Sequence, residues 1–572
     1  MDGQATSARP GCLIATVDKS RITAFNSREF LFVCAIGIVL SVVTTWPLAV
    51  NLSTHFPQIG YGDPYITSWW LAWDGYALIH QPLQLFDANV FWPLQDSLAM
   101  SEATLGYAPV ASIGSGAVAA VVRYNLLFMF TYALAFVGTY LFARELTVSP
   151  VAAAVGGAIF AYAPFRMDQA THLQIISSGA IPLALFLLLR GYKSGSAATA
   201  LTGWLVATWQ LSLGFSLGLP LAYLFAALGT VAFFVWLSRG RPHLPSSLIK
   251  ATIVGIVIFA VWGVIQARPY FRLTDEFPQG RRTEADIQFY SPPPRGLLSA
   301  PAANLIWGTA TEPIRETLER PEEKSLFPGA IPVVLGLSGV VAGGWSRGLR
   351  FGLSAGIVGC TLLSLGYAVP GGRWMFGILF RYLPGWDAIR TPGRLITFTT
   401  LGLALLASIG AERVRRSLFD RLSPERAVRI GPAVVAVLAV LVVLEGSGSL
   451  NQSPVRRVPA GQIGVPAPQF HIPSNEFHDR FYMLWSTEGF PAIANGEGAF
   501  APPFREELRA ATVNFPDQAS VDYLRTHGIA SVIFHPDLAP ETLWEQVPTR
   551  SVEGLAVTRS DEEGVIVYRI AP

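Results

Sequence analysis

The chain has 572 residues, of which 51% are hydrophobic and only 14% are charged. Soluble domains average roughly 25% charged residues, so this composition excludes a soluble globular protein and indicates a polytopic membrane protein. The net charge of +2 gives no reason to expect a nucleic-acid partner. The three cysteines, Cys12, Cys34 and Cys360, do not suggest a disulfide framework.

Eleven apolar segments are spaced as membrane-spanning helices. The first, residues 30–52, is too long for the core of a signal peptide and is predicted as a retained span. Basic residues beside it place the tail, 1–28, in the cytoplasm. The other spans are predicted at 124–142, 151–164, 173–189, 197–214, 217–237, 251–267, 328–344, 351–367, 395–411 and 430–444, with a turn near 216–220 joining the fifth to the sixth.

A further apolar segment, 105–122, is predicted not to cross the membrane. If it re-enters or lies at the interface, basic loops such as 190–196 and 412–429 all fall on the cytoplasmic side, as the positive-inside rule requires. If it crosses, they all fall outside. The rule therefore predicts long outer loops at 53–122 and 268–326, and an outer C-terminal region.

The chain after residue 446 is soluble in character. Residues 447–473 form a Pro/Gly/Ser-rich linker, and 474–572 are predicted to form a small extracytoplasmic α/β domain. Its strands are predicted at 481–485, 530–534 and 565–570, and a helix at 518–527, closed by Gly528. The predicted fold class is therefore an α-helical polytopic membrane domain, 29–446, followed by this domain.

The first outer loop is rich in acids and tryptophans and contains no Lys or Arg between residues 55 and 106. Asp63 and the proline after it suit the start of a helix, on which Trp69, Trp70 and Trp73 share one face. That face is predicted to lie flat in the lipid headgroup layer. A carboxylate at the mouth of the first span is placed to act as a general base, although helix capping alone would also explain Asp63.

Two more acids of this loop, Asp87 and Glu102, are candidate site residues. Without a basic partner they would repel one another if close, and a divalent cation or a raised pKa would relieve the repulsion. Glu102 could also simply supply charge to a helix N-terminus. Asp74 and Asp96 are interpreted as solvent-exposed.

Four basic side chains are predicted to bind substrate. Arg166 and His172 lie at the outer ends of the third and fourth spans, where a guanidinium can bind a phosphate or merely reach the interface. Arg390 and Arg394 lie on the outer side, where the positive-inside rule disfavours them, and are predicted to hold a lipid-linked phosphate. An ion pair with Asp387 or with the C-terminal domain is the alternative.

The order of these features resembles the GT-C glycosyltransferases, which include protein mannosyltransferases and lipid A aminoarabinose transferases. The chain is most similar to uncharacterised bacterial membrane proteins near that superfamily, in the runs FDANVFWP (86–93), SEATLG (101–106), LPG (383–385), IRTPGR (389–394) and YLRTHGI (523–529). The resemblance implies a catalytic base at the position of Asp63, an organising acid at that of Glu102, a polyprenyl-phosphate sugar as donor and a bacterial plasma membrane. No Asp-Glu pair or Asp-X-Asp motif ends the first span, so Asp63 is matched by position only.

The sequence thus predicts a membrane glycosyltransferase that moves a sugar from a polyprenyl-phosphate donor to an acceptor hydroxyl of a glycan, lipid or protein on the outer face. The hydroxyl loses its proton to a carboxylate, and arginines or a divalent cation stabilise the leaving phosphate. One alternative is a transporter or lipid flippase, which would need ionisable residues near the bilayer midplane. Another is a non-enzymatic envelope assembly scaffold that binds a partner through its outer domain.

Overall fold

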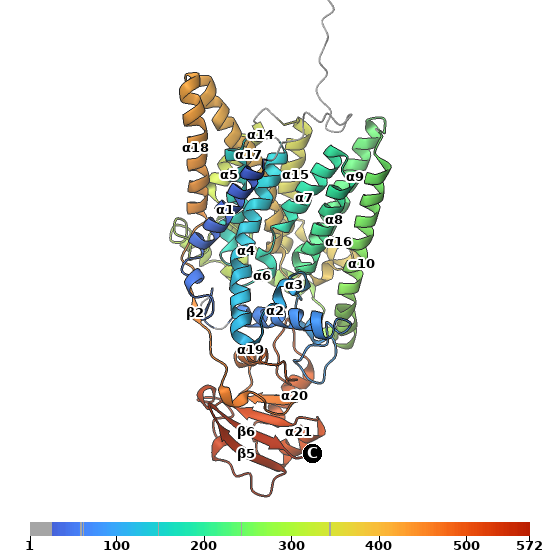
Figure 1. Ribbon diagram of the computed structural model, residues 1–572, viewed down its shortest axis with the longest axis vertical. Coiled ribbons are helices and arrows are strands. Elements are labelled where there is room, and N and C mark those ends of the chain that lie inside the picture. Colours follow the sequence, from blue (N-terminus) through green and yellow to red (C-terminus); the bar gives the residue numbers. More distant parts are fainter. Residues whose placement is uncertain (1–25, 58–59, 61, 147, 242, 342–344) are drawn as a thin grey trace, which may run out of the picture.

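The computed structural model describes residues 26–57, 60, 62–146, 148–241, 243–341 and 345–572. A helical bundle forms most of the molecule, and a small sheet domain lies at one end of it (Figure 1). Most of the predicted tail, 1–28, lies outside the described residues, and so does Cys12.

Seven helical segments of the described chain are long and apolar enough to cross a membrane, so the chain is a multi-pass membrane protein. They are α1 (Ser27–Thr44), α4 (Gly116–Glu145), Leu173–Ser194 with α6 (Leu173–Ile176) and α7 (Ala180–Ser194), α9 (Phe215–Ser238), α10 (Ser246–Glu276), Pro392–Arg421 with α17 (Ile396–Arg421), and α18 (Pro424–Glu445). The four remaining predicted spans overlap helices that are not among these seven: α5 (Pro150–Ala161), α8 (Ala197–Ser212), α14 (Ala330–Val341) and α15 (Arg347–Ser364). The count of eleven spans stays a prediction.

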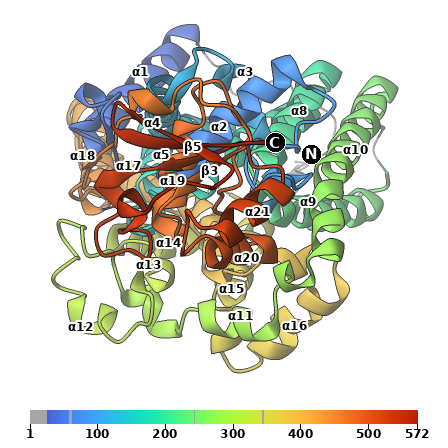
Figure 2. The same cartoon turned by 90° about the horizontal axis from the view of Figure 1, so that it is seen from below.

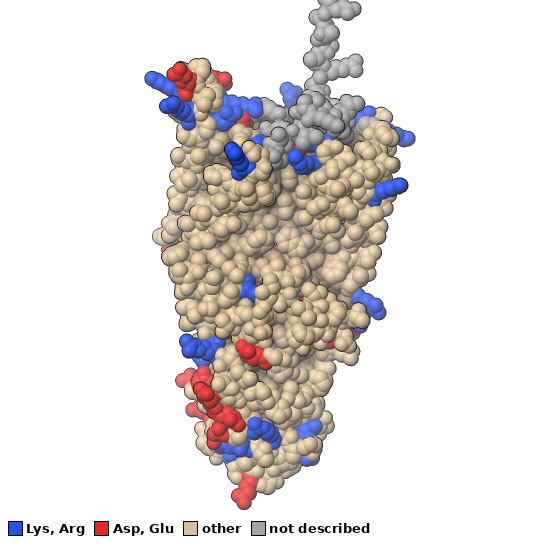
Figure 3. All heavy atoms as spheres, viewed as in Figure 1, with Lys and Arg blue, Asp and Glu red and all other residues tan. Residues whose placement is uncertain are grey.

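A broad belt of uncharged surface separates two charged ends of the molecule (Figure 3). Exposed apolar side chains cover helices in this belt; Phe234 of α9 is 62% exposed and Val264 of α10 is 71% exposed. Such a surface suits lipid rather than water. Inside the bundle, small residues allow close packing: a Cβ at Gly339 would lie 2.0 Å from the carbonyl oxygen of Leu406, so the backbones of α14 and α17 are in contact.

Ion pairs tie the helices together at the end away from the sheet domain. Arg144 of α4 lies 2.7 Å from Glu29 of α1, and Arg190 of α7 lies 2.9 Å from Glu145 of α4. Lys and Arg side chains gather at this end, around the tops of α17 and α18 in Figure 3.

Residues 105–122 form no separate span, in agreement with the prediction: η4 (Leu105–Tyr107) and α3 (Ala108–Ala111) are short. The predicted loop 53–122 ends earlier than expected, because α4 already begins at Gly116. The turn predicted at 216–220 is also displaced, because α8 ends at Ser212 and α9 begins at Phe215.

The predicted helix after Asp63 is confirmed as α2 (Asp63–His80), with Gly62 as its N-cap. The prediction that its tryptophans lie in the headgroup layer is wrong, because Trp69, Trp70 and Trp73 are all buried. Protein covers this face: the ring of Trp73 meets that of Phe490, 5.4 Å away, in an edge contact.

The sheet domain has four strands in the order β3-β4-β6-β5, with β3 parallel to β4 and the other pairs antiparallel. They are β3 (Gln469–Ile472), β4 (Ser531–Phe534), β5 (Val557–Glu562) and β6 (Val565–Ile570). The strands predicted at 530–534 and 565–570 and the helix at 518–527, which is α21 (Gln518–Thr526), are confirmed. β3 lies within the range predicted as a linker. A short pair, β1 (His55–Phe56) with β2 (Ser453–Pro454), ties that range to the first loop.

The strand predicted at 481–485 is wrong, because these residues end the helix α19 (Glu476–Trp485). The Asn475 side chain caps this helix by accepting the backbone N–H groups of Phe477 and His478. Its apolar run is buried all round, because α19 lies between α2 and the sheet domain (Figure 1). A short segment whose residues are all buried shows neither the hydrophobic period of a helix nor that of a strand. Hydrophobic periodicity therefore could not distinguish a helix from a strand at 481–485.

A buried ion pair joins α19 to the sheet domain and gives a test of this packing. The Asp479 carboxylate is fully buried and accepts from Arg509 Nη2 and Asn495 Nδ2, each at 2.9 Å. We expect Asp479→Ala to lower the free energy of unfolding by about 1–3 kcal/mol, because Arg509 Nη2 and the Asn495 amide would lose a buried acceptor, while Arg509 keeps its ion pair with Glu506 at 2.8 Å. Denaturant unfolding of the full chain, followed by tryptophan fluorescence, measures this change.

The matched control is Asp522→Ala, which removes a carboxylate from an exposed pair with Arg525. Its effect should stay within about 0.5 kcal/mol. Equal effects of the two substitutions would contradict the assigned role of Asp479.

Candidate functional site

Charged side chains from four separate segments meet where the bundle joins the sheet domain. His172 Nε2 lies 3.3 Å from Asp63 Oδ2 and 3.9 Å from Glu323 Oε1. Arg394 Nη2 lies 2.7 Å from the same Glu323 oxygen, and Gln169 Nε2 donates to Glu323 Oε2 at 3.2 Å. We call Asp63, Gln169, His172, Glu323 and Arg394 the Asp63 cluster.

Four of the five members lie at a helix end or in a one-turn helix, and Gln169 lies in the turn that precedes α6. Asp63 is the first residue of α2, and His172 is the N-cap of α6. Glu323 belongs to the one-turn helix α13 (Pro321–Lys324), and Arg394 to the turn η10 (Pro392–Leu395) that leads into α17. The side chain of Asp63 keeps 41% of its surface exposed, against 17% or less for His172, Glu323 and Arg394. The cluster therefore opens to the outside at Asp63.

The electrostatics of the cluster keep its carboxylates ionised. Burial by itself would raise the pKa of Asp63, but the hydrogen bond and charge of His172, with the charges of Arg480 and Arg394, lower it overall. The pKa of Glu323 is lowered in the same way, since Arg394 and His172 outweigh its burial. Asp63 is thus a partly exposed carboxylate beside fixed positive charge.

Glu102 lies next to the cluster but is held by a different helix. Its Oε1 accepts the backbone N–H of Ser216 at 2.5 Å, and its Oε2 accepts the Ser216 hydroxyl at 2.8 Å. Gly214, with φ at +144°, makes room for this contact, because a Cβ there would lie 2.7 Å from Glu102 Oε1. Burial raises the pKa of Glu102, while Ser216 and the charges of Arg394 and His172 oppose the rise. Glu102 therefore fixes the first loop to the N-terminus of α9.

Three predicted site residues have other contacts. Asp87 Oδ1 accepts a backbone N–H of its own loop at 2.9 Å. Arg166 is buried and donates to Ser178 Oγ at 2.8 Å and to a backbone carbonyl at 2.9 Å. Arg390 lies 4.9 Å from the ring centre of Tyr290. The structure thus brings Asp63, His172 and Arg394 together, places Glu102 beside them and puts these three elsewhere.

The sequence did not point to Glu323 or Gln169. Glu323 belongs to an acidic pair in a polar, proline-containing loop, and no pattern in that loop indicates which acid turns inward. Asp168 lies nearby, and its burial together with the charges of Glu322 and Glu323 raises its pKa to about 8. Only the folding of the second large loop against residues 163–176 reveals these neighbours.

The charge balance of the Asp63 cluster is supplied by the protein itself. The carboxylates of Asp63 and Glu323 are contacted by His172 and Arg394. Within the described residues, no group of three or more His, Cys, Asp or Glu side chains is arranged to hold a metal ion. The divalent cation therefore stays a prediction of the sequence.

The prediction that Asp74 and Asp96 are solvent-exposed is wrong. Asp74 is completely buried, accepts from Thr104 Oγ1 at 3.1 Å, and has its pKa raised to about 7 by burial. Asp96 is partly buried and forms an ion pair with Arg272 at 2.9 Å. Both differences arise because the first loop folds back over α2 and reaches α10.

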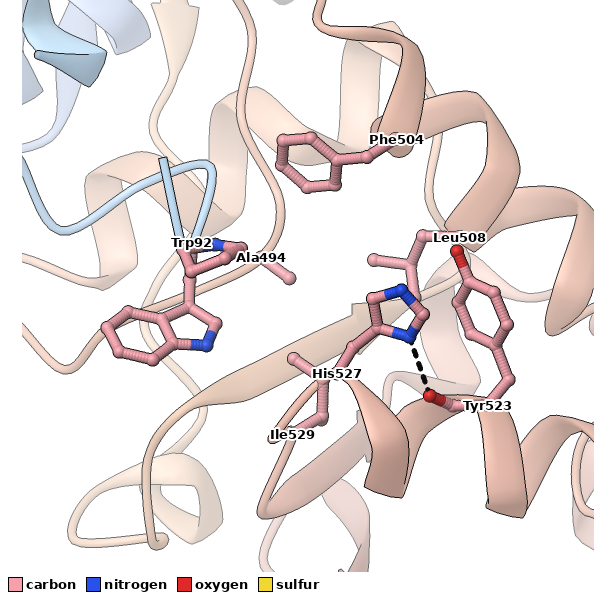
Figure 4. A pocket seen from close by; sticks show the side chains of 8 residues that line it. Trp92, Ala494, Phe504, Leu508, Tyr523, His527 and Ile529 are labelled. Carbon is pink, nitrogen blue, oxygen red and sulfur yellow. Dashed lines mark hydrogen bonds between the residues drawn. The ribbon is translucent and has the colours of Figure 1, made fainter. Parts of the chain in front are cut away.

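A shallow hollow also lies between the first loop and the sheet domain (Figure 4). Its lining is mostly apolar and includes Trp92, Phe504, Tyr523 and His527. The ring of His527 stacks on that of Tyr523, with centres 4.1 Å apart, and its Nδ1 lies 2.8 Å from the Tyr523 carbonyl oxygen. The hollow shares no residue with the Asp63 cluster, and we assign it to packing between the two parts of the chain.

The fold and the site together define a multi-pass helical membrane protein with a charged cluster where its bundle meets a sheet domain. No protein-family model and no curated protein sequence matches the chain.

Three solved structures show remote similarity. Arabinofuranosyltransferase AftD from Mycobacteria is 14% identical over 96% of this chain and 42% of that chain, with a TM-score of 0.48. An Archaeoglobus fulgidus oligosaccharyltransferase is 14% identical over 89% and 70%, with a TM-score of 0.33. ArnT from Cupriavidus metallidurans, bound to undecaprenyl phosphate, is 12% identical over 95% and 98%, with a TM-score of 0.35. The chain spans less than half the length of the first.

The buried Asp74 predicts a pH-dependent stability. In the unfolded chain its carboxyl loses its proton near pH 3.8, whereas in the folded protein it keeps the proton up to about pH 7. Because the folded protein binds this proton more tightly than the unfolded chain does, the free energy of unfolding falls as the pH rises between these two values. We expect Asp74→Asn to match the unaltered protein near pH 4 and to be more stable at pH 8, by up to a few kcal/mol.

Thermal unfolding of both proteins across this pH range is the measurement. The control Asp522→Asn, at an exposed position, should follow the unaltered protein at every pH. A stability difference for Asp74→Asn that does not change with pH would contradict a protonated Asp74.

Proposed function

We propose that the chain is a membrane glycosyltransferase of the GT-C type. It moves a sugar from a polyprenyl-phosphate-linked donor to an acceptor hydroxyl at the membrane surface. The observation that supports this most directly is the Asp63 cluster, in which an accessible carboxylate lies 3.3 Å from His172, near Arg394. Glycosyl transfer needs a base and a cation within one site, and this cluster supplies both.

In the proposed reaction the acceptor oxygen forms a bond to the anomeric carbon of the sugar. The bond from that carbon to the phosphate oxygen breaks, and its electron pair leaves with the polyprenyl phosphate. The proton of the acceptor hydroxyl passes to Asp63. Because its pKa is lowered, Asp63 is ionised at neutral pH and can accept this proton. The positive charge of Arg394 stabilises the leaving phosphate, and a ring nitrogen of His172 lies beside Asp63 as a further polar contact.

The remaining residues act through position in this proposal. Glu323 orients Arg394 and His172 through its contacts with both. Glu102 fixes the first loop against α9, and Asp87 shapes the same loop. Arg166 and Arg390, which the sequence also assigned to the phosphate, are left out of the proposed donor contacts, because Arg166 is buried and hydrogen-bonded within the bundle and Arg390 lies at Tyr290, outside the Asp63 cluster.

The proposed orientation follows from the two charged ends. The end that carries the basic segment 412–429 is assigned to the cytoplasm by the positive-inside rule. The Asp63 cluster and the sheet domain then face outward from the plasma membrane. An acceptor would approach Asp63 from that side, where the cluster is open.

Replacing Asp63 and Arg394 should separate chemistry from binding. We expect Asp63→Asn to reduce turnover by roughly 10²- to 10⁴-fold while the donor still binds, because the amide cannot accept the proton. We expect Arg394→Ala to weaken donor binding by roughly 10- to 100-fold, because a charged contact with the phosphate is lost. The measurements are binding of a panel of polyprenyl-phosphate sugars to the full chain in detergent, and release of polyprenyl phosphate from them.

The matched control is Asp96→Asn, the same substitution in the same loop at a residue paired with Arg272 instead. It should leave both binding and turnover near those of the unaltered protein. Full turnover by folded Asp63→Asn would exclude Asp63 as the base. Movement of the intact donor across a bilayer, with no release of polyprenyl phosphate, would favour a flippase.

A further inference from the structure

Two arginines lie over the ring of Tyr290, the last residue of α11 (Glu284–Tyr290), and a third lies near one of them. The guanidinium carbons of Arg390 and Arg320 lie 4.9 and 5.8 Å from the ring centre. Arg282 is the third and directly precedes Thr283, the N-cap of α11; burial and then the positive charge of Arg390 lower its pKa. We call Arg282, Tyr290, Arg320 and Arg390 the Tyr290 cluster.

Positive charge in this cluster is only partly balanced by the protein, because three guanidinium groups share the charge of one carboxylate, Asp286. Among the described residues, none of its three guanidinium groups has a hydrogen bond or ion-pair partner, and Arg320 and Arg390 contact aromatic rings. The charge of Asp286 acts on Arg282 and Arg390, and its carboxylate accepts from the backbone and side chain of Thr283, both at 2.8 Å. Glu284, on the same helix, is engaged by another arginine at 2.6 Å. Like charges gathered in this way are stabilised when an anion joins them.

The neighbouring helix α16 (Gly372–Tyr382) indicates where this cluster lies. Arg381 of α16 forms the ion pair with Glu284 of α11, and Figure 2 shows the two helices side by side at the rim of the bundle. Three exposed apolar residues fall four apart on α16 and share one face: Trp374 (73% exposed), Ile378 (39%) and Tyr382 (75%). Such a face with Trp and Tyr is typical of a helix at the membrane–water interface.

We propose that the Tyr290 cluster binds the phosphate of an anionic membrane phospholipid. Guanidinium groups present planar, forked donors that match phosphate oxygens, and the aromatic ring holds them in place through cation–π contacts. The exposed face of α16 sets the cluster at the level of lipid headgroups. The site shares no residue with the Asp63 cluster, so the inference does not depend on the proposed transfer reaction.

The test is lipid binding by the full chain in detergent. Phosphatidylglycerol would be titrated into the protein, with zwitterionic phosphatidylcholine, which has no net charge, as the comparison. Bound lipid would be counted by native mass spectrometry. We expect preferential binding of phosphatidylglycerol, and a loss of roughly 100-fold in affinity in the triple variant Arg282→Gln, Arg320→Gln, Arg390→Gln, since each cation near a lipid surface contributes roughly fivefold. If the triple variant does not fold, Arg320→Gln alone, at an exposed position, should weaken binding about fivefold.

The matched control is the triple variant Arg421→Gln, Arg426→Gln, Arg429→Gln, which removes three exposed arginines at the opposite end of the molecule. It should bind phosphatidylglycerol as the unaltered protein does. Equal losses in the two triple variants would show charge attraction without a site and overturn the proposal. Displacement of the lipid by equimolar inorganic phosphate would reassign the site to free phosphate. Displacement by equimolar polyprenyl phosphate would reassign it to the donor.

Discussion

The burial of α2 between the helical bundle and α19 is the constraint on which the rest of the outer surface depends. A Cβ at Gly75 would lie 2.3 Å from the backbone of Ala111, so α2 packs directly on the chain that leads into α4. On its other side the ring of Tyr65 meets that of Phe481 at 5.1 Å. Close packing from both sides leaves α2 no freedom to shift, and Asp63 at its first position is therefore held against His172.

The short loop 389–394 contributes one arginine to each of two sites, the Asp63 cluster and the Tyr290 cluster. Arg394 points to Glu323 and shares the Asp63 cluster, whereas Arg390, four residues earlier, lies on Tyr290. Arg394 is neutralised and positioned by acids of the chain. Arg390 lies close to Arg282 and Arg320, and these three cations outnumber Asp286, the acid whose charge acts on them. A paired cation suits a precise contact in a reaction, while unpaired cations at the interface suit an anion that the membrane itself supplies.

Much of the fold follows from local composition. Long uncharged runs predict spanning helices because a bilayer accepts little else, and each predicted span does overlap a helix. Asp63-Pro64 marked the start of α2, and Gly528 marked the end of α21. The failures came where burial was complete: the tryptophans of α2 and the run 481–485 are covered on all sides, and no periodicity shows which partner covers them.

For the site, the sequence by itself determined which outer loops carry acidic residues and which carry arginine. Charged side chains are costly within the bilayer, so they occur mainly at the two ends of the spanning helices. The sequence led to Asp63, His172 and Arg394 individually. Only the tertiary structure decided that these three meet, and that Glu323 joins them from a loop about 150 residues after His172. It also decided that Glu102 is held by α9 and that Arg390 lies on Tyr290. The physical reason is that contacts between side chains on different helices are set by packing angles and loop closure, which leave no periodic trace in the sequence.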